Sequence, residues 1–345
     1  MSLFPSKTGL LFIAFLITHS LAFSQEESTV FQKEGLVKLT IETDIKALIK
    51  NKFKDEYQPA KIIANNDGVI REKEIRLKAR GAFRKKHCKF PPIKLNFKHT
   101  EFEDPGLQQL KTLKLVTHCQ NQDAYQNYIL KEYLVYKIFN LFTEQSFRVR
   151  LIEVTYKDTS GKHKPTTKLS FIIEHADAMA QRNGTTIFER ENIATAQTSR
   201  KEMTFMSVFH YMVGNTDWYV PELHNIKLLT PTKPGAIYPV AVPYDFDYSG
   251  IVNASYAEPD PVLGISSVRE RVFRGICREN AEFMEALKML EDKKEEIYAL
   301  IHEFEYLNEG DKTEMVNYLD EFFIEVANNP NRLIENFDNS CIGTK

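Results

Sequence analysis

The chain has 345 residues, of which 43% are hydrophobic and 27% are charged, and its formal net charge is -2. These values are typical of an ordinary globular protein, and the near-neutral charge gives no reason to expect nucleic acid as the main partner. The length permits one large domain or two lobes, each able to bury a hydrophobic core.

The N-terminus is predicted to be a targeting segment and not part of the fold. Lys7 supplies a positive charge, residues 9–22 form an apolar run, and Ala22-Phe23-Ser24 offers small residues before a cleavage site. We therefore expect a signal peptide over residues 1–24 and export to the periplasm, the cell surface or the exterior. An uncleaved membrane anchor is the alternative. No second long apolar run follows, so we expect no membrane span after processing.

Alternating apolar and polar residues predict strands in the first part of the chain, over residues 36–42, 60–64 and 72–79, with a short helix over residues 45–53. A basic loop with one glycine follows. A glycine loop between two strands can bring backbone N–H groups to a phosphate, which nearby cations could neutralise: Arg80, Arg84, Lys85 and Lys86. A solvated basic turn is the alternative for each lysine. Arg80, at the end of an alternating strand, could contact a phosphate or a carboxylate.

Two more strands are predicted over residues 91–97 and 111–117, and each carries a lysine near its centre, Lys94 and Lys114. Alternation places each lysine on the face opposite to its apolar neighbours. Either lysine could therefore face a cleft or plain water, and both are kept as candidates.

Four cysteines in a chain that is expected to be exported favour disulfide bonds. If the two lysine-bearing strands pair antiparallel, Cys88 just before the first lies close to Cys119 just after the second. We therefore predict a Cys88–Cys119 bridge, which leaves Cys277–Cys341 as the default second bridge. Free buried thiols are the alternative.

A helix is predicted over residues 123–141, with its polar residues clustered on one side. Glu132 falls nearly opposite that side, among tyrosines, where a carboxylate is costly unless a cation or hydrogen bonds satisfy it. Glu132 is therefore expected to reach inward to Lys94 or Lys114, or else to bond with tyrosine hydroxyls. A pair of strands would then complete a first lobe of mostly antiparallel sheet with one helix: residues 148–156 and 166–173.

A helix and a hairpin are predicted in the middle of the chain. The helix covers residues 201–213, and Gly214 stands where a helix C-terminus often needs a left-handed residue. Asp217 follows in the next loop. Two apolar runs further on, residues 226–229 and 236–244, flank a turn and can pair as antiparallel strands.

The outer end of this hairpin carries acidic and amide side chains. Pairing would put Asn225 near Asp245, with Asp217 in the loop upstream and Asp247 two residues beyond. Oxygen atoms that converge in this way suit Mg²⁺, which prefers hard oxygen ligands and usually binds together with substrate phosphates. A role in turns is the competing interpretation for each residue alone, but the whole order favours a metal site.

The rest of the chain is predicted to be irregular and then helical. Residues 251–267 contain several prolines, and three arginines follow them, Arg269, Arg271 and Arg274. These arginines could bind an acidic acceptor or hold their loop by salt bridges. Amphipathic helices would pack the second lobe, over residues 279–301, 312–327 and 332–337.

The order GNTDW…HN…PYDFDYSG (residues 214–250), with RGAFRKKHCKFPPIKLNF (residues 80–97) upstream, resembles the spore-coat protein H (CotH-like) family of atypical protein kinases. The resemblance covers residues 70–260. It implies a secreted or surface protein with a kinase-like fold, which uses ATP with Mg²⁺ or Mn²⁺ and transfers phosphate to protein hydroxyls. The family's usual Arg-Gly-Asn is Arg80-Gly81-Ala82 here, a departure that concerns nucleotide binding.

The resemblance also implies roles for individual residues. Asp217 matches the catalytic-loop aspartate, and Asn225 and Asp245 match metal ligands, with Asp247 assisting. In kinases a strand lysine holds the nucleotide phosphates and pairs with a helix glutamate. The residues expected to position the phosphates here are Lys94 or Lys114, held by Glu132, together with Arg80.

Together these observations predict an α+β protein with a two-lobed, protein-kinase-like fold. A β-rich lobe would cover residues 25–176, and a helical lobe with the acidic hairpin would cover residues 177–345. The predicted function is an exported kinase that binds a nucleotide and a protein acceptor. A non-catalytic surface or structural binding protein of the same fold is one alternative. A metal-dependent nucleotidyltransferase or hydrolase that uses the same acidic cluster is the other.

Overall fold

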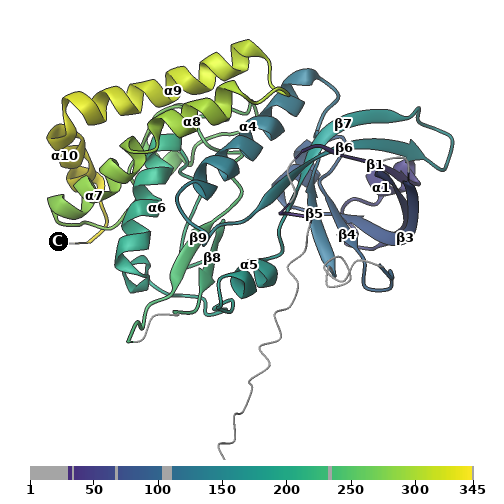
Figure 1. Ribbon diagram of the computed structural model, residues 1–345, viewed down its shortest axis with the longest axis horizontal. Coiled ribbons are helices and arrows are strands. Elements are labelled where there is room, and N and C mark those ends of the chain that lie inside the picture. The colour runs from purple at the N-terminus through teal and green to yellow at the C-terminus, as the bar shows by residue number, and fades with distance from the viewer. Residues whose placement is uncertain (1–29, 33–34, 67–68, 103–110, 232–234, 344–345) are drawn as a thin grey trace, which may run out of the picture.

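The computed structural model describes residues 30–32, 35–66, 69–102, 111–231 and 235–343. The predicted signal peptide over residues 1–24 lies outside the described residues, as does part of the predicted hairpin turn. Within the described ranges the chain forms a β-barrel followed by a mainly helical region (Figure 1).

Seven strands close into the barrel: β1 (Val37–Thr43), β2 (Gln58–Asn66), β3 (Val69–Ala79), β4 (Ile93–Asn96), β5 (Thr112–Val116), β6 (Val149–Asp158) and β7 (Thr166–Ile173). Their order around the barrel is β1-β2-β3-β4-β5-β7-β6. Neighbouring strands are antiparallel except β1 and β6, which run parallel and close the barrel. Val37 lies opposite Ile152, and Thr43 lies opposite Asp158.

The closed barrel contradicts the two-lobed, protein-kinase-like fold that the sequence predicts, in which the first lobe is a mostly antiparallel sheet. Most of the strands themselves are predicted correctly. The parallel pairing of β1 with β6 has no counterpart in the prediction. Alternation shows which face of a strand is buried, but it does not show which distant strand will pair with its edge.

The inside of the barrel is filled by the apolar residues of the alternating strands. These side chains are fully buried and belong to one cluster that includes Ile41, Leu77, Ile93, Leu115 and Val154. Each such side chain contributes about 1.5–3 kcal/mol by leaving water. Lys94 and Lys114 alternate with these residues and so lie on the outside of the barrel.

The basic segment after β3 is partly helical and not only a loop. Gly81, with a φ of 80°, turns the chain out of the barrel, and α2 (Phe83–His87) follows. Cys88 ends this helix and forms the predicted disulfide with Cys119. The second predicted bridge, Cys277–Cys341, is also confirmed.

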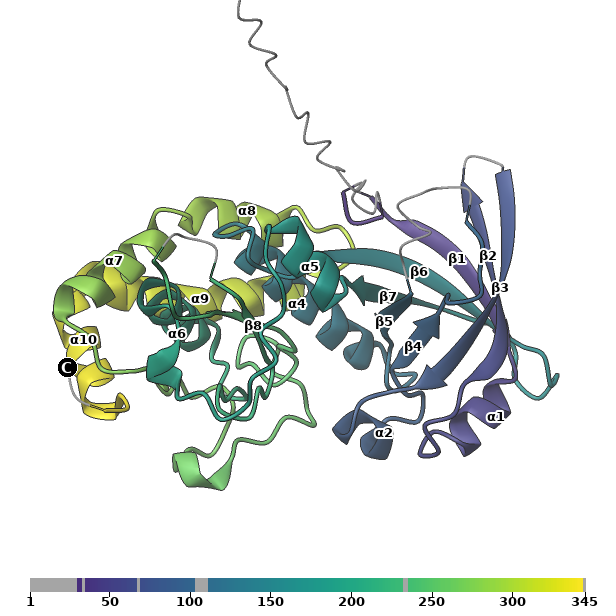
Figure 2. The same cartoon turned by 90° about the horizontal axis from the view of Figure 1, so that it is seen from below.

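Two helices pack against the barrel. The short α1 (Ile45–Lys50) begins at Asp44, whose Oδ1 accepts a hydrogen bond from Ala47 N at 2.8 Å. The long α4 (Asp123–Asn140) confirms the predicted helix and lies between the barrel and the helical region in both views (Figures 1 and 2). One apolar cluster extends from β5 and β7 through α4 into the C-terminal helices, so the two parts share a continuous core.

The helical region contains α5 (Ala176–Arg182), η1 (Thr195–Gln197), α6 (Arg200–Val213), β8 (Ile226–Leu229), β9 (Val240–Pro243), η2 (Pro261–Leu263), α7 (Asn280–Glu291), α8 (Lys294–His302), α9 (Glu309–Asn328) and α10 (Pro330–Ser340). The helix that the sequence predicts over residues 279–301 is thus two helices, which break at Asp292 and Lys293. The hairpin of β8 and β9 is antiparallel, as predicted.

The arginines between residues 268 and 277 hold their own segment in place. Arg269 pairs with Glu314 at 3.3 Å, and Arg271 pairs with Glu321 at 3.1 Å. Arg274 donates a hydrogen bond to the carbonyl oxygen of the residue before Asp217. Of the two roles considered for these arginines, the structure supports the one in which they hold the loop.

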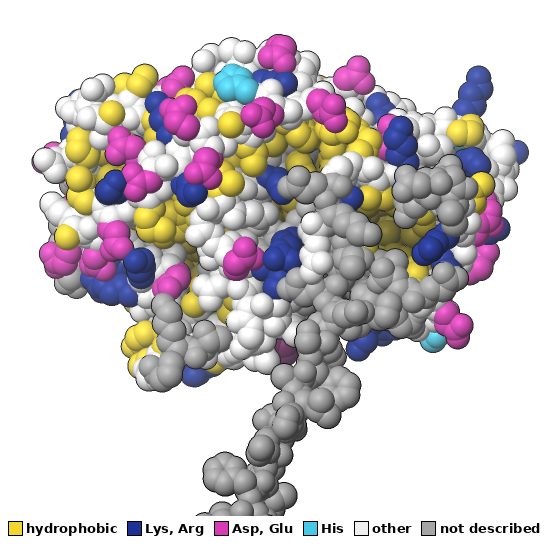
Figure 3. All heavy atoms as spheres, in the orientation of Figure 1, with side chains coloured by type: hydrophobic (Ala, Val, Ile, Leu, Met, Phe, Trp, Pro, Cys, Tyr) yellow, Lys and Arg dark blue, Asp and Glu magenta, His cyan; other side chains and the backbone are white. Residues whose placement is uncertain are grey.

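The two disulfide bonds indicate an oxidising environment. In the part of the chain that the structure describes, no helix combines the length and the apolar character needed to cross a lipid bilayer. On the face seen in Figure 3, acidic and basic side chains are interspersed, in keeping with the net charge of -2.

Candidate functional site

The loop after α6 positions Asp217. The helix ends at Gly214, whose φ of 67° is left-handed, as predicted. A Cβ atom at this position would collide with the hydroxyl of Tyr318 and crowd the backbone of Gly250, so that only glycine fits. The buried Asn215 then accepts a hydrogen bond from Asp217 N on its Oδ1 at 3.0 Å, which fixes the start of the Asp217 side chain.

The carboxylate of Asp217 contacts both Asn225 and His224. Asn225 Nδ2 donates to Asp217 Oδ2 at 2.9 Å and to the Asp217 carbonyl oxygen at 2.8 Å. His224 Nε2 lies 2.8 Å from Asp217 Oδ1, and this hydrogen bond raises the pKa of His224. Both carboxylate oxygens are therefore held by neighbours, while the side chain stays partly exposed.

The hairpin brings Asn225 beside Asp245. Ile226 lies opposite Pro243, and just outside this pair Tyr244 N donates to the Asn225 carbonyl oxygen at 3.0 Å. Asp245 follows directly. Asn225 has a φ of 52° and Asp245 a φ of 65°, both in the left-handed region that residues other than glycine seldom occupy.

In Asp245 the backbone N–H has a hydrogen-bond partner, whereas the carboxylate has none among the described residues. Its N–H donates to the hydroxyl of Tyr136 on α4 at 2.7 Å, so the helix holds the backbone. Its carboxylate forms no hydrogen bond or ion pair with any residue that the structure describes. Backbone conformations of this kind persist where the surroundings hold them, and they gather at binding and catalytic positions. The backbone of Asp245 is therefore fixed by its neighbours. Its carboxylate is uncommitted, which means that it has no hydrogen-bond or ion-pair partner among the described residues.

Asp247 is buried two residues further on. Its Oδ2 accepts a hydrogen bond from the hydroxyl of Tyr256 at 3.0 Å. Burial, together with the neighbouring Asp245, raises the pKa of Asp247 to about 7. A cation placed beside Asp247 would offset both causes of this rise.

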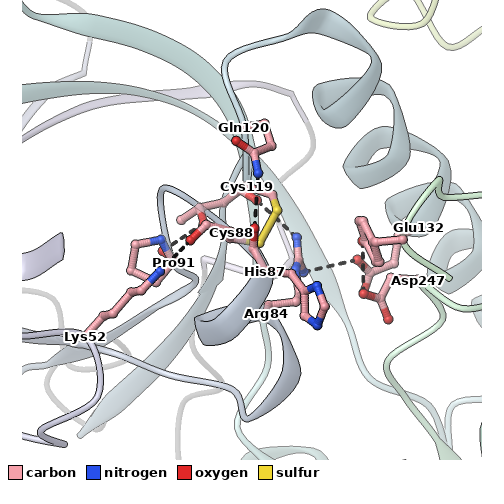
Figure 4. Close-up of a disulfide and its surroundings, with 11 residues drawn as sticks. Lys52, Arg84, His87, Cys88, Pro91, Cys119, Gln120, Glu132 and Asp247 are labelled. Atoms are coloured by element: carbon pink, nitrogen blue, oxygen red, sulfur yellow. Dashed lines mark hydrogen bonds and ion pairs between the residues drawn. A yellow bond between two sulfur atoms is a disulfide. The ribbon is translucent and has the colours of Figure 1, made fainter. Parts of the chain in front are cut away.

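Glu132 points inward, as predicted, but its partner is neither of the predicted lysines. The side chain is 1% exposed, and its Oε2 lies 3.9 Å from Nη1 of Arg84 on α2 (Figure 4). Neither carboxylate oxygen has a hydrogen-bond partner among the described residues, so the tyrosine alternative is also wrong. Burial, with Asp247 adding to it, raises the pKa of Glu132 well above its ordinary value. At 3.9 Å Arg84 only partly offsets this desolvation.

Arg84 is the site residue whose role the sequence does not show, because it is one cation of a basic run. Burial works to lower the pKa of Arg84, but Tyr256, Asp247 and Glu132 together raise it above its ordinary value. Nη2 donates to the carbonyl oxygen of Thr117 at 3.2 Å, while Nε is buried without a partner in the described part of the chain. The sequence signal that could have indicated this role is the spacing of Arg84 and Cys88, which lie one helical turn apart, so that a disulfide at Cys88 would also position Arg84.

The Cys88–Cys119 bridge anchors α2 next to the acidic residues (Figure 4). Cys88 N donates to the Arg84 carbonyl oxygen at 2.8 Å, and Lys52 Nζ donates to the Cys88 carbonyl oxygen at 2.8 Å. Because α2 has only one turn, these contacts and the bridge, more than the helix itself, hold Arg84 against Glu132.

Three lysines lie side by side across β3, β4 and β5, and we call them the lysine row. Lys78 is directly opposite Lys94, and Lys94 is directly opposite Lys114. Like charges in this position destabilise a sheet. Asp55 pairs with Lys78 at 2.7 Å, but Lys94 has no ion pair with any described residue. An anion lying along the lysine row would remove the repulsion.

Lys114 and Arg80 join the lysine row to the acidic hairpin. Lys114 Nζ lies 4.8 Å from the ring centroid of Tyr244, the residue before Asp245. Burial and the neighbouring Arg80 lower the pKa of Lys114 to about 8. Burial also lowers the pKa of Arg80, with Asp245 acting against it. Arg80 Nε is buried without a hydrogen-bond partner in the described ranges.

The residues at the hairpin fit a divalent cation that shares its coordination with a ligand. Among the described residues, no group of three or more His, Cys, Asp or Glu could hold a metal ion alone. Mg²⁺, however, usually takes one or two carboxylates and completes its shell with water and substrate phosphates. The uncommitted Asp245, with Asp247 and Asn225 beside it, matches that requirement. Arg80 Nε and Arg84 Nε are buried without a hydrogen-bond partner among the described residues, and guanidinium groups suit phosphate oxygens, which are strong acceptors.

No family model and no curated protein matches the chain. Among solved structures, it is similar to the proinflammatory kinase CtkA of Helicobacter pylori. The two chains share 12% identity over 72% of this chain and 92% of that chain, with a TM-score of 0.38. The likeness is distant, and the function proposed below rests on the site itself.

Proposed function

We propose that the protein is a phosphotransferase that uses ATP with Mg²⁺ or Mn²⁺ and transfers phosphate to a hydroxyl of a protein acceptor. One observation carries this proposal: the lysine row ends at a hairpin whose Asp245 carboxylate is uncommitted. Binding of a nucleoside triphosphate needs cations along the phosphate groups and a divalent cation at the phosphate that reacts. The two requirements meet here on adjacent elements.

The barrel would supply the phosphate-binding cations. Neighbouring positions across a sheet are about 5 Å apart, so Lys94 and Lys114 can contact successive groups of one phosphate chain. Arg80 would contact the end nearest the hairpin. Glu132 would act indirectly, because it holds Arg84 and not a strand lysine.

The hairpin would supply the metal ligands, with Asp245, Asp247 and Asn225 holding the cation through oxygen atoms. Such a cation neutralises negative charge on the phosphates when it is bound. Asp217 is the residue that would orient the acceptor hydroxyl or take up its proton. Its two oxygens are already held by Asn225 and His224, so the carboxylate is oriented before an acceptor arrives.

We further propose that the chain is exported and that its mature form begins near Gln25. The two disulfide bonds support export, because such bonds persist in oxidising compartments. ATP is scarce outside the cytoplasm, so a non-catalytic binding role is the outcome to test against.

A nucleotide-and-metal binding experiment tests the site directly. Magnesium and ATP at a hundredfold excess over Kd should stabilise the wild-type protein by about 2.7 kcal/mol, measured by thermal unfolding. Asp245→Asn should abolish this gain, because it removes the charge while asparagine tolerates the φ of 65°. The matched control is Asp123→Asn, at a side chain that is 93% exposed on the first turn of α4, and it should retain the gain.

The products formed from labelled ATP decide the reaction. With casein as the probe acceptor, transfer of the γ-phosphate supports the proposal. Transfer of AMP would instead identify a nucleotidyltransferase, and release of phosphate alone would identify a hydrolase. If ATP and ADP fail to stabilise the wild type with either metal, the proposal is wrong and a non-catalytic role stands in its place.

A further inference from the structure

A pocket lies where α4, α6, α7 and β9 meet, and none of Asp217, Asn225, Asp245 and Asp247 lines it. Its volume is about 180 Å³. The apolar walls come from four elements and from the segment just after α4: Phe139, Phe142, Phe205, Val240 and Met289. Phe139 lies seven positions beyond Glu132, which places the pocket about 10 Å further along the axis of α4. No residue assigned to phosphate or metal lines it.

The walls suit an aromatic ring. The ring centroids of Phe142 and Phe205 are 5.1 Å apart, and those of Phe139 and Phe205 are 6.3 Å apart. A further ring can join such a group at the separations that aromatic pairs prefer, about 4.5–7 Å. Met289 is half-buried, and the flexibility of a methionine side chain lets it adjust to a ligand. A volume of roughly 150 Å³ is large enough for benzene, so the pocket has room for a single ring.

Polar side chains lie at the rim of the pocket, and they differ in whether they already have a hydrogen-bond or ion-pair partner. Lys201 is paired with Glu285 at 2.6 Å, and Glu202 bonds with the hydroxyl of Ser199. Gln145 is different: its backbone N–H donates to Thr143 Oγ1 at 3.0 Å, but its side-chain amide bonds with no described residue. An amide can both donate and accept, so it can bond a hydroxyl on a bound ring.

We propose that this pocket binds a single-ring aromatic molecule with one small polar substituent. The ring packs among the phenylalanines and Met289, and the substituent bonds with the amide of Gln145. The site is independent of the proposed phosphotransferase activity, so failure of ATP binding leaves it standing.

Methionine-methyl NMR with phenol as the probe tests this directly. A bound ring shifts the methyl resonance of Met289, so we expect a saturable shift as phenol is added. Met284 lies on the same helix and is exposed, so it reports non-specific binding. Met315 is fully buried in α9 and should not respond. Equal or linear shifts at Met289 and Met284 would overturn the proposal.

Two variants with matched controls locate the ligand. Val240→Phe fills the pocket and should abolish the Met289 shift, whereas Val262→Phe adds the same ring at an exposed site and should not. Gln145→Leu keeps the apolar walls. The affinity for benzene should stay unchanged. The wild type should bind phenol about fivefold more tightly than benzene, as expected for one hydrogen bond, and Gln145→Leu should lose this difference. Saturable binding that survives Val240→Phe, or an equal affinity of the wild type for phenol and benzene, would contradict the assignment.

Discussion

Replacing Cys88 and Cys119 together with alanine removes the bridge that ties α2 to the end of β5. The bridge constrains the unfolded chain, and the size of this effect depends on the length of the loop that it closes. With a sequence separation of 31, the chain-entropy relation predicts a loss of about 3.7 kcal/mol in the free energy of unfolding at 25 °C. The Cys277–Cys341 bridge spans 64 positions, so its removal should cost about 0.6 kcal/mol more.

The two bridges should differ in their effect on the site. Arg84 stands one turn before Cys88, and its position against Glu132 depends on α2. The variant without Cys88 and Cys119 should therefore lose most of the stabilisation by magnesium and ATP. The variant without Cys277 and Cys341 should keep it.

Urea unfolding measures the first effect, and thermal unfolding with and without magnesium and ATP measures the second. The slope of the urea transition should increase, because the unfolded chain without the bridge expands and exposes more surface. The entropic reasoning fails if removal of Cys88–Cys119 lowers stability by less than about 1 kcal/mol. The structural reasoning fails if both variants lose the ligand effect to the same degree.

Two further predictions concern pH. In protein treated with EDTA, unfolding should become easier as the pH rises from about 4 to 7, since burial raises the pKa of Asp247 from 3.8 to about 7 and its stabilising contribution is lost on ionisation. Urea titrations should show this slope flattened in Asp247→Asn, and an unchanged slope would contradict the assignment. The pH dependence that arises from His210 has the opposite sign. His210 is buried against Trp218, and burial lowers its pKa from 6.5 to about 3. Its contribution to the free energy of unfolding is therefore full above pH 6.5 and is lost as the pH falls. Relative to the wild type, the free energy of unfolding of His210→Phe should therefore rise by about 2 kcal/mol between neutral pH and about pH 5. The exposed His163→Phe should gain nothing, and equal behaviour of the two variants would refute the account.

Local sequence signals were sufficient for several parts of this protein. The left-handed end of α6 at Gly214 and the antiparallel hairpin each depend on residues that are close in the chain. The pairing of β4 with β5 follows from alternation and from their succession along the chain, and the bridge between Cys88 and Cys119 follows from that pairing. The same short-range logic brought Asn225 next to Asp245, although their roles stay predictions.

Only the tertiary structure decided how these parts assemble. β1 and β6 close the barrel although a long stretch of chain separates them, and no local pattern specifies a distant strand edge. Helical periodicity shows that Glu132 points inward, but the cation that meets it depends on α2, which the sequence shows only as a basic run. Periodicity reports the direction of a side chain relative to its own backbone. The neighbour that it meets is determined by the packing of segments far apart in the sequence, and for this reason the lysine row, Arg84 and the apolar pocket became visible only in three dimensions.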